Sequence, residues 1–385
     1  MYRIGLKMLT EDKAKYIGMI LSISFSALII TQQMAIFIGL MRRSYSFIAD
    51  TPQARIWVMN PSVKMIDDVN NVRESELMRI RSIKGVKWAM PFFKGLISAR
   101  LPNGQFQTCN LLGVDSGTFI GAPHTVVEGA IEDLRKPYSI IVDREAAFDK
   151  LAQYQGEGKP KRPLAVGDEL ELNDRRARVV GICNLTKTFR SDPCIYTTYK
   201  NATFYTPYQR KELSFIMVAA DGSVPEEQLC QHIAQVTHLK AYTKEQFEQV
   251  TIDYYLKNTG IPINFGIAVL LGLIIGIAIM GQIFFNFTTD NLKYLAMFTV
   301  MGASRKMLAY ITLMQALWVG FIGWGLGTGV AAAIGFFTEG TQLAFYLHWQ
   351  LLVGTGVLML LLCIGVSLLS IIRIYTVELS MVYRQ

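Results

Sequence analysis

The chain has 385 residues, of which 51% are hydrophobic and 18% are charged, and its formal net charge at pH 7 is +8. This composition is too apolar for an ordinary soluble protein and too rich in charge for a protein that lies wholly within a membrane. The basic excess is mild and not clustered on one stripe or helix, which argues against a nucleic-acid-binding protein.

Four segments contain no Asp, Glu, Lys or Arg, and each exceeds the roughly 20 residues that a helix needs to cross a bilayer. They are Tyr16–Met41, Asn258–Thr289, Met307–Thr338 and Gly340–Ile372. The region Arg42–Lys257 holds 29 of the 38 basic and 25 of the 30 acidic residues, so its formal charge is +4. The sequence therefore predicts four transmembrane helices per chain, with a large α+β extracytoplasmic domain between helix 1 and helix 2.

The first 15 residues are basic and amphipathic, which predicts a helix lying on the anionic inner leaflet. A signal peptide is the alternative, but the apolar segment that follows is too long and lacks a small-x-small cleavage site. The first predicted span is polar for a lipid-facing helix, so we expect it to pack against other spans or against a second copy of itself. Its polar residues are Ser22, Ser24, Ser26, Thr31, Gln32 and Gln33.

The predicted extracytoplasmic domain alternates strands and short helices. A helix is expected before Gly85, and a strand VKWAM follows it up to Pro91. The segment FKGLISARL then predicts one arm of a hairpin, and a second hairpin should turn at Asn173 and Asp174. A helix is also expected at Pro225–Thr237.

The segment between the second and third spans predicts a short helix at the membrane surface. Asp290 and Asn291 are expected to cap its start, and Gly302 to end it. One face of this helix would carry Leu292, Leu295, Ala296, Thr299 and Val300. Such a helix is placed to contact another protein, although an ordinary connector is the alternative.

Basic residues gather at three of the short flanks and are missing from the short loop around Glu339. The positive-inside rule therefore predicts that both termini and the loop between spans two and three are cytoplasmic. The flanking basic residues are Arg3, Lys7, Lys13, Lys15, Lys293, Arg305, Lys306, Arg373 and Arg384.

Glycines recur at four-residue spacing in spans two and three, which permits close approach of helix backbones. The pairs are Gly272 and Gly276, Gly323 and Gly327, and Gly325 and Gly329. Either simple close packing or a sliding contact in a moving transporter explains them. No span contains an acidic or basic residue, which argues against a proton-coupled antiporter or channel.

No enzymatic chemistry is predicted, because the chain has no P-loop, GxSxG, HExxH or CxxC motif. Its four histidines show no spacing typical of a metal site. Asp143 and Glu145 are interpreted as solvated charges. Cys183 and Cys194 flank a loop that a disulfide would close, but scattered free thiols are the other interpretation.

Several segments carry a family resemblance. They are the first span Leu21–Ser44, the helix and strand Ile80–Pro91, the hairpin Leu164–Ile182, the loop from Leu295 to Ser304, and the C-terminal Glu378–Arg384. Together with the layout of one span, a large domain and three spans, they resemble the MacB/FtsX-like ABC transporter permeases, closest in layout to the DevC-type permeases. This sequence departs from the pattern at Tyr294, where Glu is usual, at Thr299, where a basic residue is usual, and at Leu379, where Pro is usual.

The resemblance implies a homodimeric permease of the inner membrane bound to a dimer of ABC ATP-binding subunits, which hold the ATP and Mg²⁺. No cofactor is expected on this chain. ATP-driven movement would be transmitted to the extracytoplasmic domains, which would act on a glycolipid, lipid, haem or drug. An HlyD-like periplasmic adaptor, an outer-membrane channel and membrane lipids are further expected partners. The alternative is a non-transporting FtsX-like signal transducer.

The resemblance also implies which residues contact the ATPase: Leu292, Leu295, Ala296, Phe298, Met301, Gly302, Ala303 and Ser304. The expected divisions are a cytoplasmic helix 1–15, spans 16–41, 261–287, 307–337 and 349–372, an extracytoplasmic domain 42–257, a coupling helix 290–304 and a cytoplasmic tail 373–385.

Overall fold

The structure is a computed structural model that describes residues 2–101, 103–153, 161–206, 213–338 and 341–376. The chain forms two compact units. The α/β unit is Met41–Thr259, and the helical unit comes from the chain on either side of it. The predicted C-terminal motif Glu378–Arg384 lies outside the described residues.

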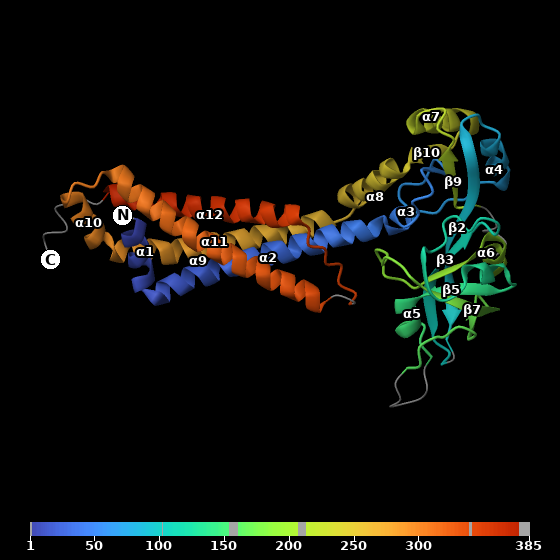
Figure 1. Ribbon diagram of the computed structural model, residues 1–385, viewed down its shortest axis with the longest axis horizontal. Coiled ribbons are helices and arrows are strands. Elements are labelled where there is room, and N and C mark those ends of the chain that lie inside the picture. Colours follow the sequence, from blue (N-terminus) through green and yellow to red (C-terminus); the bar gives the residue numbers. More distant parts are fainter. Residues whose placement is uncertain (1, 102, 154–160, 207–212, 339–340, 377–385) are drawn as a thin grey trace. The chain divides into compact units, whose positions relative to one another are not determined.

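Four long apolar helices make up most of the helical unit (Figure 1). Each contains a stretch long and apolar enough to cross a membrane, which confirms the prediction of four such helices. The helices of this unit are α1 (Tyr2–Glu11), α2 (Lys13–Ser44), α9 (Ile261–Asp290), α10 (Leu292–Val300), α11 (Arg305–Phe337) and α12 (Trp349–Thr376).

The basic N-terminal segment is a helix that ends at Glu11, and α2 begins two residues later at Lys13. The Asp12 carboxylate marks this break, since it accepts the backbone N–H of Lys15 at 3.2 Å and lies 2.8 Å from the Lys15 ammonium. A carboxylate at this position satisfies a donor that the first turn of α2 leaves open. Leu9 of α1 is fully buried in the core of the helical unit with Met19 and Ile23 of α2.

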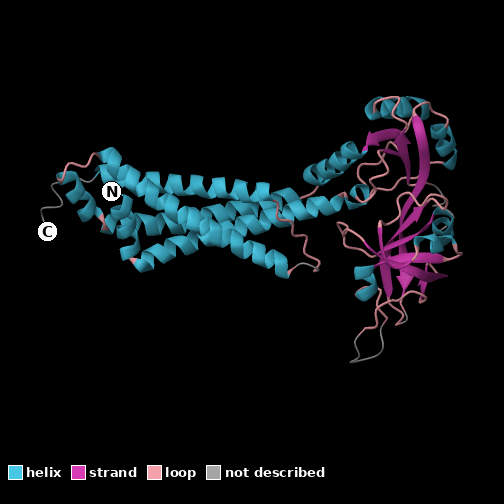
Figure 2. Cartoon of the chain, viewed as in Figure 1, coloured by secondary structure: helices cyan, strands magenta, loops and turns pink. Residues whose placement is uncertain are grey.

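Ten strands among the described residues form a continuous sheet in the α/β unit (Figure 2). Their order is β10-β1-β9-β2-β3-β8-β5-β7-β4, and β6 pairs with both β2 and β7. Most neighbours are antiparallel, but β3 with β8 and β5 with β7 are parallel. The predicted α+β domain is therefore confirmed as a domain that mixes strands and helices.

The strands are β1 (Ile56–Met59), β2 (Val86–Arg100), β3 (Phe106–Val114), β4 (Thr125–Gly129), β5 (Ser139–Asp143), β6 (Glu169–Leu172), β7 (Arg175–Asn184), β8 (Cys194–Thr198), β9 (Phe215–Ala220) and β10 (Lys240–Thr243). The helices are α3 (Ser46–Ala49), α4 (Glu74–Arg81), η1 (Ile131–Arg135), α5 (Arg144–Phe148), α6 (Tyr199–Tyr205), α7 (Glu226–Thr237) and α8 (Lys244–Asn258).

Strand β2 is the long element that both halves of the sheet share. It pairs with β9 through Phe92 and with β3 from Phe93 onward. The sequence predicted two strands separated at Pro91, but β2 continues through this proline. The Phe92 carbonyl accepts the Ser214 N–H on the β9 side, so the nitrogen of Pro91 faces the opposite edge, where β3 pairing has not begun. The missing N–H of Pro91 therefore removes no hydrogen bond from the sheet.

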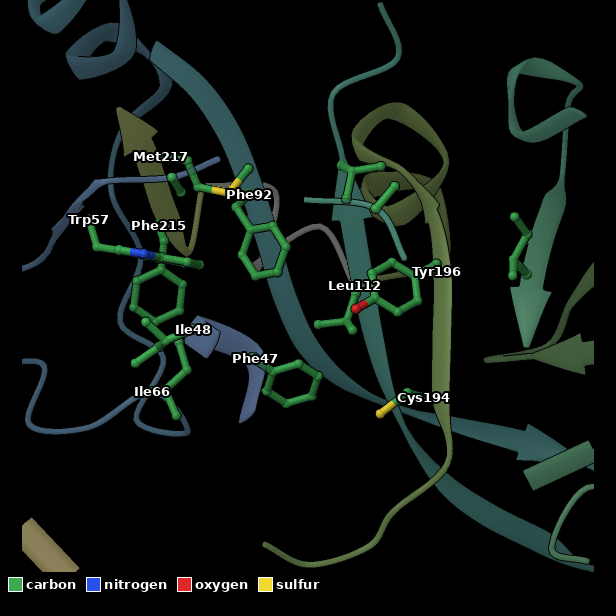
Figure 3. Close-up of a cluster of buried hydrophobic side chains, with 14 of the residues drawn as sticks. Phe47, Ile48, Trp57, Ile66, Phe92, Leu112, Cys194, Tyr196, Phe215 and Met217 are labelled. Atoms are coloured by element: carbon green, nitrogen blue, oxygen red, sulfur yellow. The ribbon is translucent and has the colours of Figure 1, made fainter. Parts of the chain in front are cut away.

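Three buried apolar clusters pack on the sheet, one spanning one face and two sharing the other face, one in each half. The cluster that spans a whole face contains Trp57, whose ring meets Phe92 and Phe215 edge-on at centroid distances of 5.7 and 5.9 Å (Figure 3). Such edge-to-face contacts add to the stabilisation that burial of large rings provides. This cluster also contains Phe47 of α3, Leu112 of β3 and Tyr196 of β8, so it joins strands from both halves of the sheet.

Local sequence signals set several of these boundaries. Asn173 and Asp174 have φ of 46° and 61°, the two positive values that a two-residue turn between β6 and β7 requires. The predicted hairpin at this point is confirmed. Helix α8 begins with a reciprocal capping box between Thr243 and Gln246. Gly85 has φ of 97° between α4 and β2, a value that favours glycine.

Candidate functional site

The segment predicted to contact a partner forms the helix α10, one residue after α9. Its C-terminus has the 6→1 hydrogen bond of a Schellman motif, which the Ala303 N–H donates to the Phe298 carbonyl at 2.9 Å. Gly302 lies between these groups with φ of 94°, which a residue with a Cβ adopts only with strain. Glycine at this position therefore sets where α10 ends and where the chain turns toward α11.

The start of α10 was predicted to be capped by Asp290 and Asn291. Helix α9 runs to Asp290, and the Asn291 side-chain amide donates to the Phe287 carbonyl at 2.8 Å, at the end of α9. The Asp290 carboxylate instead pairs with the ammonium of Lys15 in the first turn of α2. Both polar side chains thus contact the long helices, and capping of α10 by them stays a prediction.

One face of α10 and its C-terminal turn expose large apolar side chains. The exposed fractions are 56% for Tyr294, 55% for Met297, 64% for Val300 and 80% for Met301. A spacing of three and four residues puts Tyr294, Met297 and Met301 on one side of the helix. Tyr294 and Met297 were not among the predicted contact residues, although this same spacing identifies them.

The predicted contact residues have different environments. Leu292, Phe298 and Ala303 are half-buried, whereas Met301, Gly302 and Ser304 are exposed. The side chains of Leu295, Ala296 and Thr299 lie outside the described part of the structure. Their role in binding an ATPase stays a prediction.

Four of the six predicted packing glycines lie where another helix of the same chain approaches closely. A Cβ at Gly327 would overlap the Ser24 carbonyl oxygen of α2, and one at Gly323 would lie 2.7 Å from the Ile23 Cβ. On α9, a Cβ at Gly276 would overlap the Ser26 hydroxyl, and one at Gly272 would lie 3.2 Å from Cγ1 of Ile30. Gly325 and Gly329 have no atom within 4 Å of such a Cβ. The Gly272 and Gly276 pair therefore faces α2 of its own chain.

Several hydroxyl groups of α2 remain unpaired in this packing. The side-chain oxygens of Ser22, Ser24, Ser26 and Thr31 are buried and have no hydrogen-bond partner among the described residues. The sequence predicted that these polar groups would face other helices. Ser26 and Thr31 are completely buried within the helical unit, which fits that expectation for these two residues.

The α/β unit contains a cleft of about 480 Å³ between its central strands and neighbouring loops. Lys94 of β2 reaches it from a buried position, and its ammonium lies 2.6 Å from the Asp67 carboxylate. The Tyr255 hydroxyl of α8 donates to the second oxygen of Asp67 at 3.3 Å. Burial and the neighbouring Asp67 raise the pKa of the Tyr255 hydroxyl, so this group stays protonated at neutral pH. Sequence reasoning missed this cluster, because its members come from three distant segments.

The cysteines of the chain are all free and buried, including Cys183 and Cys194, so the loop between these two residues is not closed by a disulfide. Burial raises the pKa of the Cys109 thiol to about 12, which keeps it uncharged and unreactive. No group of three His, Cys, Asp or Glu side chains within the described ranges is arranged to hold a metal ion.

Asp143 does not have the solvated character that the sequence indicated. It ends β5 and is mostly buried, and burial raises the pKa of its carboxyl to about 6. Glu145 in the next turn pairs with Lys187 at 2.7 Å. The Asp143 carboxyl therefore changes charge near neutral pH, whereas its neighbour is held by a salt bridge.

Two family models match the chain. The model of the MacB-like periplasmic core domain matches residues 17–236. The model of the FtsX-like permease C-terminal domain matches residues 266–379. A comparison with curated proteins found no match.

Solved structures of low sequence identity also match. The periplasmic region of MacB from Actinobacillus actinomycetemcomitans is 15% identical, with a TM-score of 0.38, covering 55% of this chain and 96% of that one. The extracellular domain of the noncanonic ABC-type transporter YknZ from Gram-positive bacteria is 13% identical, with a TM-score of 0.34, covering 49% of this chain and 97% of that one.

Proposed function

Because this chain belongs to the family of MacB/FtsX-like permeases, we propose that it is the permease subunit of an ABC-type exporter in the inner membrane. A separate ATP-binding subunit would supply ATP hydrolysis, so this chain itself is not an enzyme. Two copies of the chain would bind two ATPase subunits. Both termini and α10 would lie in the cytoplasm, as the distribution of basic residues predicts.

In this proposal, α10 transmits the movement of the ATPase to the membrane helices. The α/β unit would move in response and drive efflux of a hydrophobic or membrane-derived substrate such as a glycolipid, lipid, haem or drug. An HlyD-like adaptor and an outer-membrane channel would complete the export route. The second copy would pack on the apolar face of α9, where Ile263, Leu270 and Ile274 are each more than half exposed.

The observation that carries this proposal is the exposed apolar face of α10. A nine-residue helix between two spans that presents Met297, Val300 and Met301 to its surroundings has surface available for a partner. Burial of these side chains in a groove of the ATPase would give the association its main driving force. Charged Lys293 is exposed on the same helix and offers a comparison site.

The test measures binding of the ATPase to variants of α10. We expect Met297→Asp to abolish co-purification of the ATPase and its stimulated ATP hydrolysis in lipid nanodiscs, because a buried carboxylate without a partner costs several kcal/mol. Leu295→Asp should act in the same way if this residue also faces the groove. Membrane insertion and the unfolding temperature of the variants should remain those of the wild type.

Lys293→Glu is the control, since it also changes the charge of α10 but at an already charged, exposed position. Its effect on ATPase binding should be small. If Met297→Asp and Leu295→Asp both bind and stimulate the ATPase like the wild type, α10 is only a connector and the proposed coupling is wrong.

The FtsX-like C-terminal match favours a second candidate function, that of a signal transducer without transport. In that case the α/β unit would activate an extracytoplasmic partner when ATP binds. Proteoliposomes with the ATPase distinguish the two candidates. An exporter should release a lipid or drug from the membrane with ATP turnover, and Met297→Asp should stop this release, whereas a transducer should release none.

A further inference from the structure

The cleft in the α/β unit is formed by parts of several segments that are distant in the sequence. Its wall consists of the loop after β1, the middle of β2, one residue of β3, the loop after β7 and one residue of α8. Its polar lining residues include Asp67, Asp68, Lys94, Asn110, Thr188 and Arg190. Its volume of about 480 Å³ is that of a site for a small molecule.

Both acidic side chains in the cleft already have partners. Asp67 accepts the Lys94 ammonium and the Tyr255 hydroxyl. Asp68 accepts the backbone N–H of Lys64 at 3.1 Å and the Asn70 amide at 3.2 Å. The acceptor capacity of these carboxylates is thus largely used within the protein.

Donors in the cleft remain without partners. The Thr188 hydroxyl is buried and has no hydrogen-bond partner among the described residues, and this side chain is only 5% exposed. Asn110 is 7% exposed and lines the same cleft. Arg190 is exposed and forms no ion pair within the described ranges. A buried hydroxyl without a partner is costly, and where it lines a cleft, as Thr188 does, a bound ligand can satisfy it.

The four charged side chains that line the cleft, Asp67, Asp68, Lys94 and Arg190, have formal charges that sum to zero. The Lys94 ammonium is balanced by Asp67 at 2.6 Å, and among the described residues Asp68 is bound only by neutral N–H groups. The Arg190 guanidinium is then the one cation of the described lining residues without a carboxylate beside it. A guanidinium binds a carboxylate with two parallel hydrogen bonds. A singly charged anion therefore fits this cleft better than a doubly charged phosphate.

We propose that this cleft binds a small organic acid, in which one carboxylate meets Arg190, Thr188 and Asn110 and an apolar body packs on the neighbouring wall. The apolar wall includes Met65, Val69, Phe93 and Leu96. The acid has two sources that share this chemistry, a soluble carboxylic acid or a fatty acid that leaves the membrane. The site lies wholly within the α/β unit and requires no ATPase.

The experiment titrates the full-length protein in phosphatidylcholine nanodiscs with phenylacetate and follows binding by calorimetry. Phenylacetamide, the uncharged isostere, is the matched probe. We expect phenylacetate to bind and phenylacetamide to bind at least about tenfold more weakly, because the amide lacks the charge that a guanidinium recognises. Nanodiscs that contain oleic acid distinguish the source: loss of the phenylacetate signal there indicates a fatty acid, and an unchanged signal indicates a soluble acid.

Two variants test the residues without disturbing the buried ion pair. Thr188→Val keeps the shape of the side chain and removes the hydroxyl, and Arg190→Gln removes the charge of an exposed residue. Each should weaken phenylacetate binding about tenfold. Thr251→Val is the matched control for the first, because Thr251 is also buried with an unpaired hydroxyl and does not line the cleft. Arg55→Gln controls for loss of an exposed arginine elsewhere.

Wild-type affinity in both controls, together with weaker binding by Thr188→Val and Arg190→Gln, supports the proposal. The proposal is overturned if the wild type binds no phenylacetate up to about 10 mM. Equal binding of phenylacetamide, or unchanged affinity in the two cleft variants, overturns it as well. A failure of this test leaves the ATPase-binding test of α10 unaffected, since the two experiments share no variant and no readout.

Discussion

The ammonium of Lys94 in the α/β unit is almost completely buried and lies 2.6 Å from a carboxylate. In the helical unit, Ser26 and Thr31 are completely buried and have no hydrogen-bond partner in the part of the chain that the structure describes. Within the described ranges, both units contain buried hydroxyls without a partner, such as Thr188 and Thr251 in the α/β unit, but the buried charge in the α/β unit has a partner of opposite charge. The helical unit relies on helix backbones that approach closely at glycines. We infer that the stability of the α/β unit depends on its buried ion pair, whereas the stability of the helical unit depends on the small size of single residues.

The largest effect is expected for Gly327→Leu in α11, which tests the role of the close approach between α11 and α2. The added Cβ would lie 2.8 Å from the Cβ of Ala27 and overlap the Ser24 carbonyl, so α2 or α11 must shift. We expect a loss of more than about 3 kcal/mol of stability, because rigid backbone cannot move aside as a side chain does. Thermal unfolding in detergent with size-exclusion chromatography measures this loss.

Gly329→Leu is the control on the same helix, since a Cβ there meets no atom within 4 Å. It should unfold at nearly the wild-type temperature. If both variants behave alike, the helical unit is not held by the close approach at Gly327, and the contrast with the α/β unit fails.

The next effect is expected for Lys94→Met, which tests whether the α/β unit depends on its buried ion pair. Methionine is similar in length to lysine but uncharged, so Asp67 loses the ammonium that lies beside it. Removing one partner of a buried pair costs about 3 kcal/mol or more. Chemical denaturation followed by tryptophan fluorescence should show this loss.

Lys87→Met on the same strand is the comparison, because Lys87 is exposed. Its unfolding midpoint should move little. Adding Asp67→Leu to Lys94→Met should restore part of the stability, since no unpaired charge then remains. If Lys94→Met and Lys87→Met have equal midpoints, the ion pair contributes nothing measurable.

The smallest effect concerns Asp143, whose buried carboxyl has a pKa raised from 3.8 to about 6. Because the folded protein binds this proton more tightly than the unfolded chain, stability is lost as pH rises from about 4 through about 6. Asp143→Asn should therefore stabilise the protein at about pH 8 by up to about 3 kcal/mol and change little at about pH 4. Unfolding midpoints at the two pH values measure the difference, and Glu132→Gln, at an exposed carboxylate, is the control variant. An equal gain at both pH values would show that the charge of Asp143 is not the cause.

The sequence predicted features that depend on neighbouring residues and missed those that depend on distant ones. The turn at Asn173 and Asp174 and the helix end at Gly302 follow from local backbone preferences, and the structure contains both. The continuation of β2 through Pro91 depends on which edge has a partner strand, and no local pattern shows this. The same holds for the cleft, where Lys94, Asp67 and Tyr255 meet only after the sheet forms.

Because β2 pairs with strands in both halves of the sheet, its two ends are expected to pair at different times during folding. Phe93 pairs with Gly113, which follows it by 20 residues, whereas Phe92 pairs with Phe215, which follows it by 123 residues. The nearer partner closes a shorter loop at lower entropic cost and is made earlier by the ribosome. The C-terminal half of β2 can thus find β3 at once, while its N-terminal half waits for β9. During synthesis, the C-terminal half of β2 is therefore paired before its N-terminal half. Until β9 is made, the edge from Val86 to Phe92 is unpaired and accessible to a chaperone.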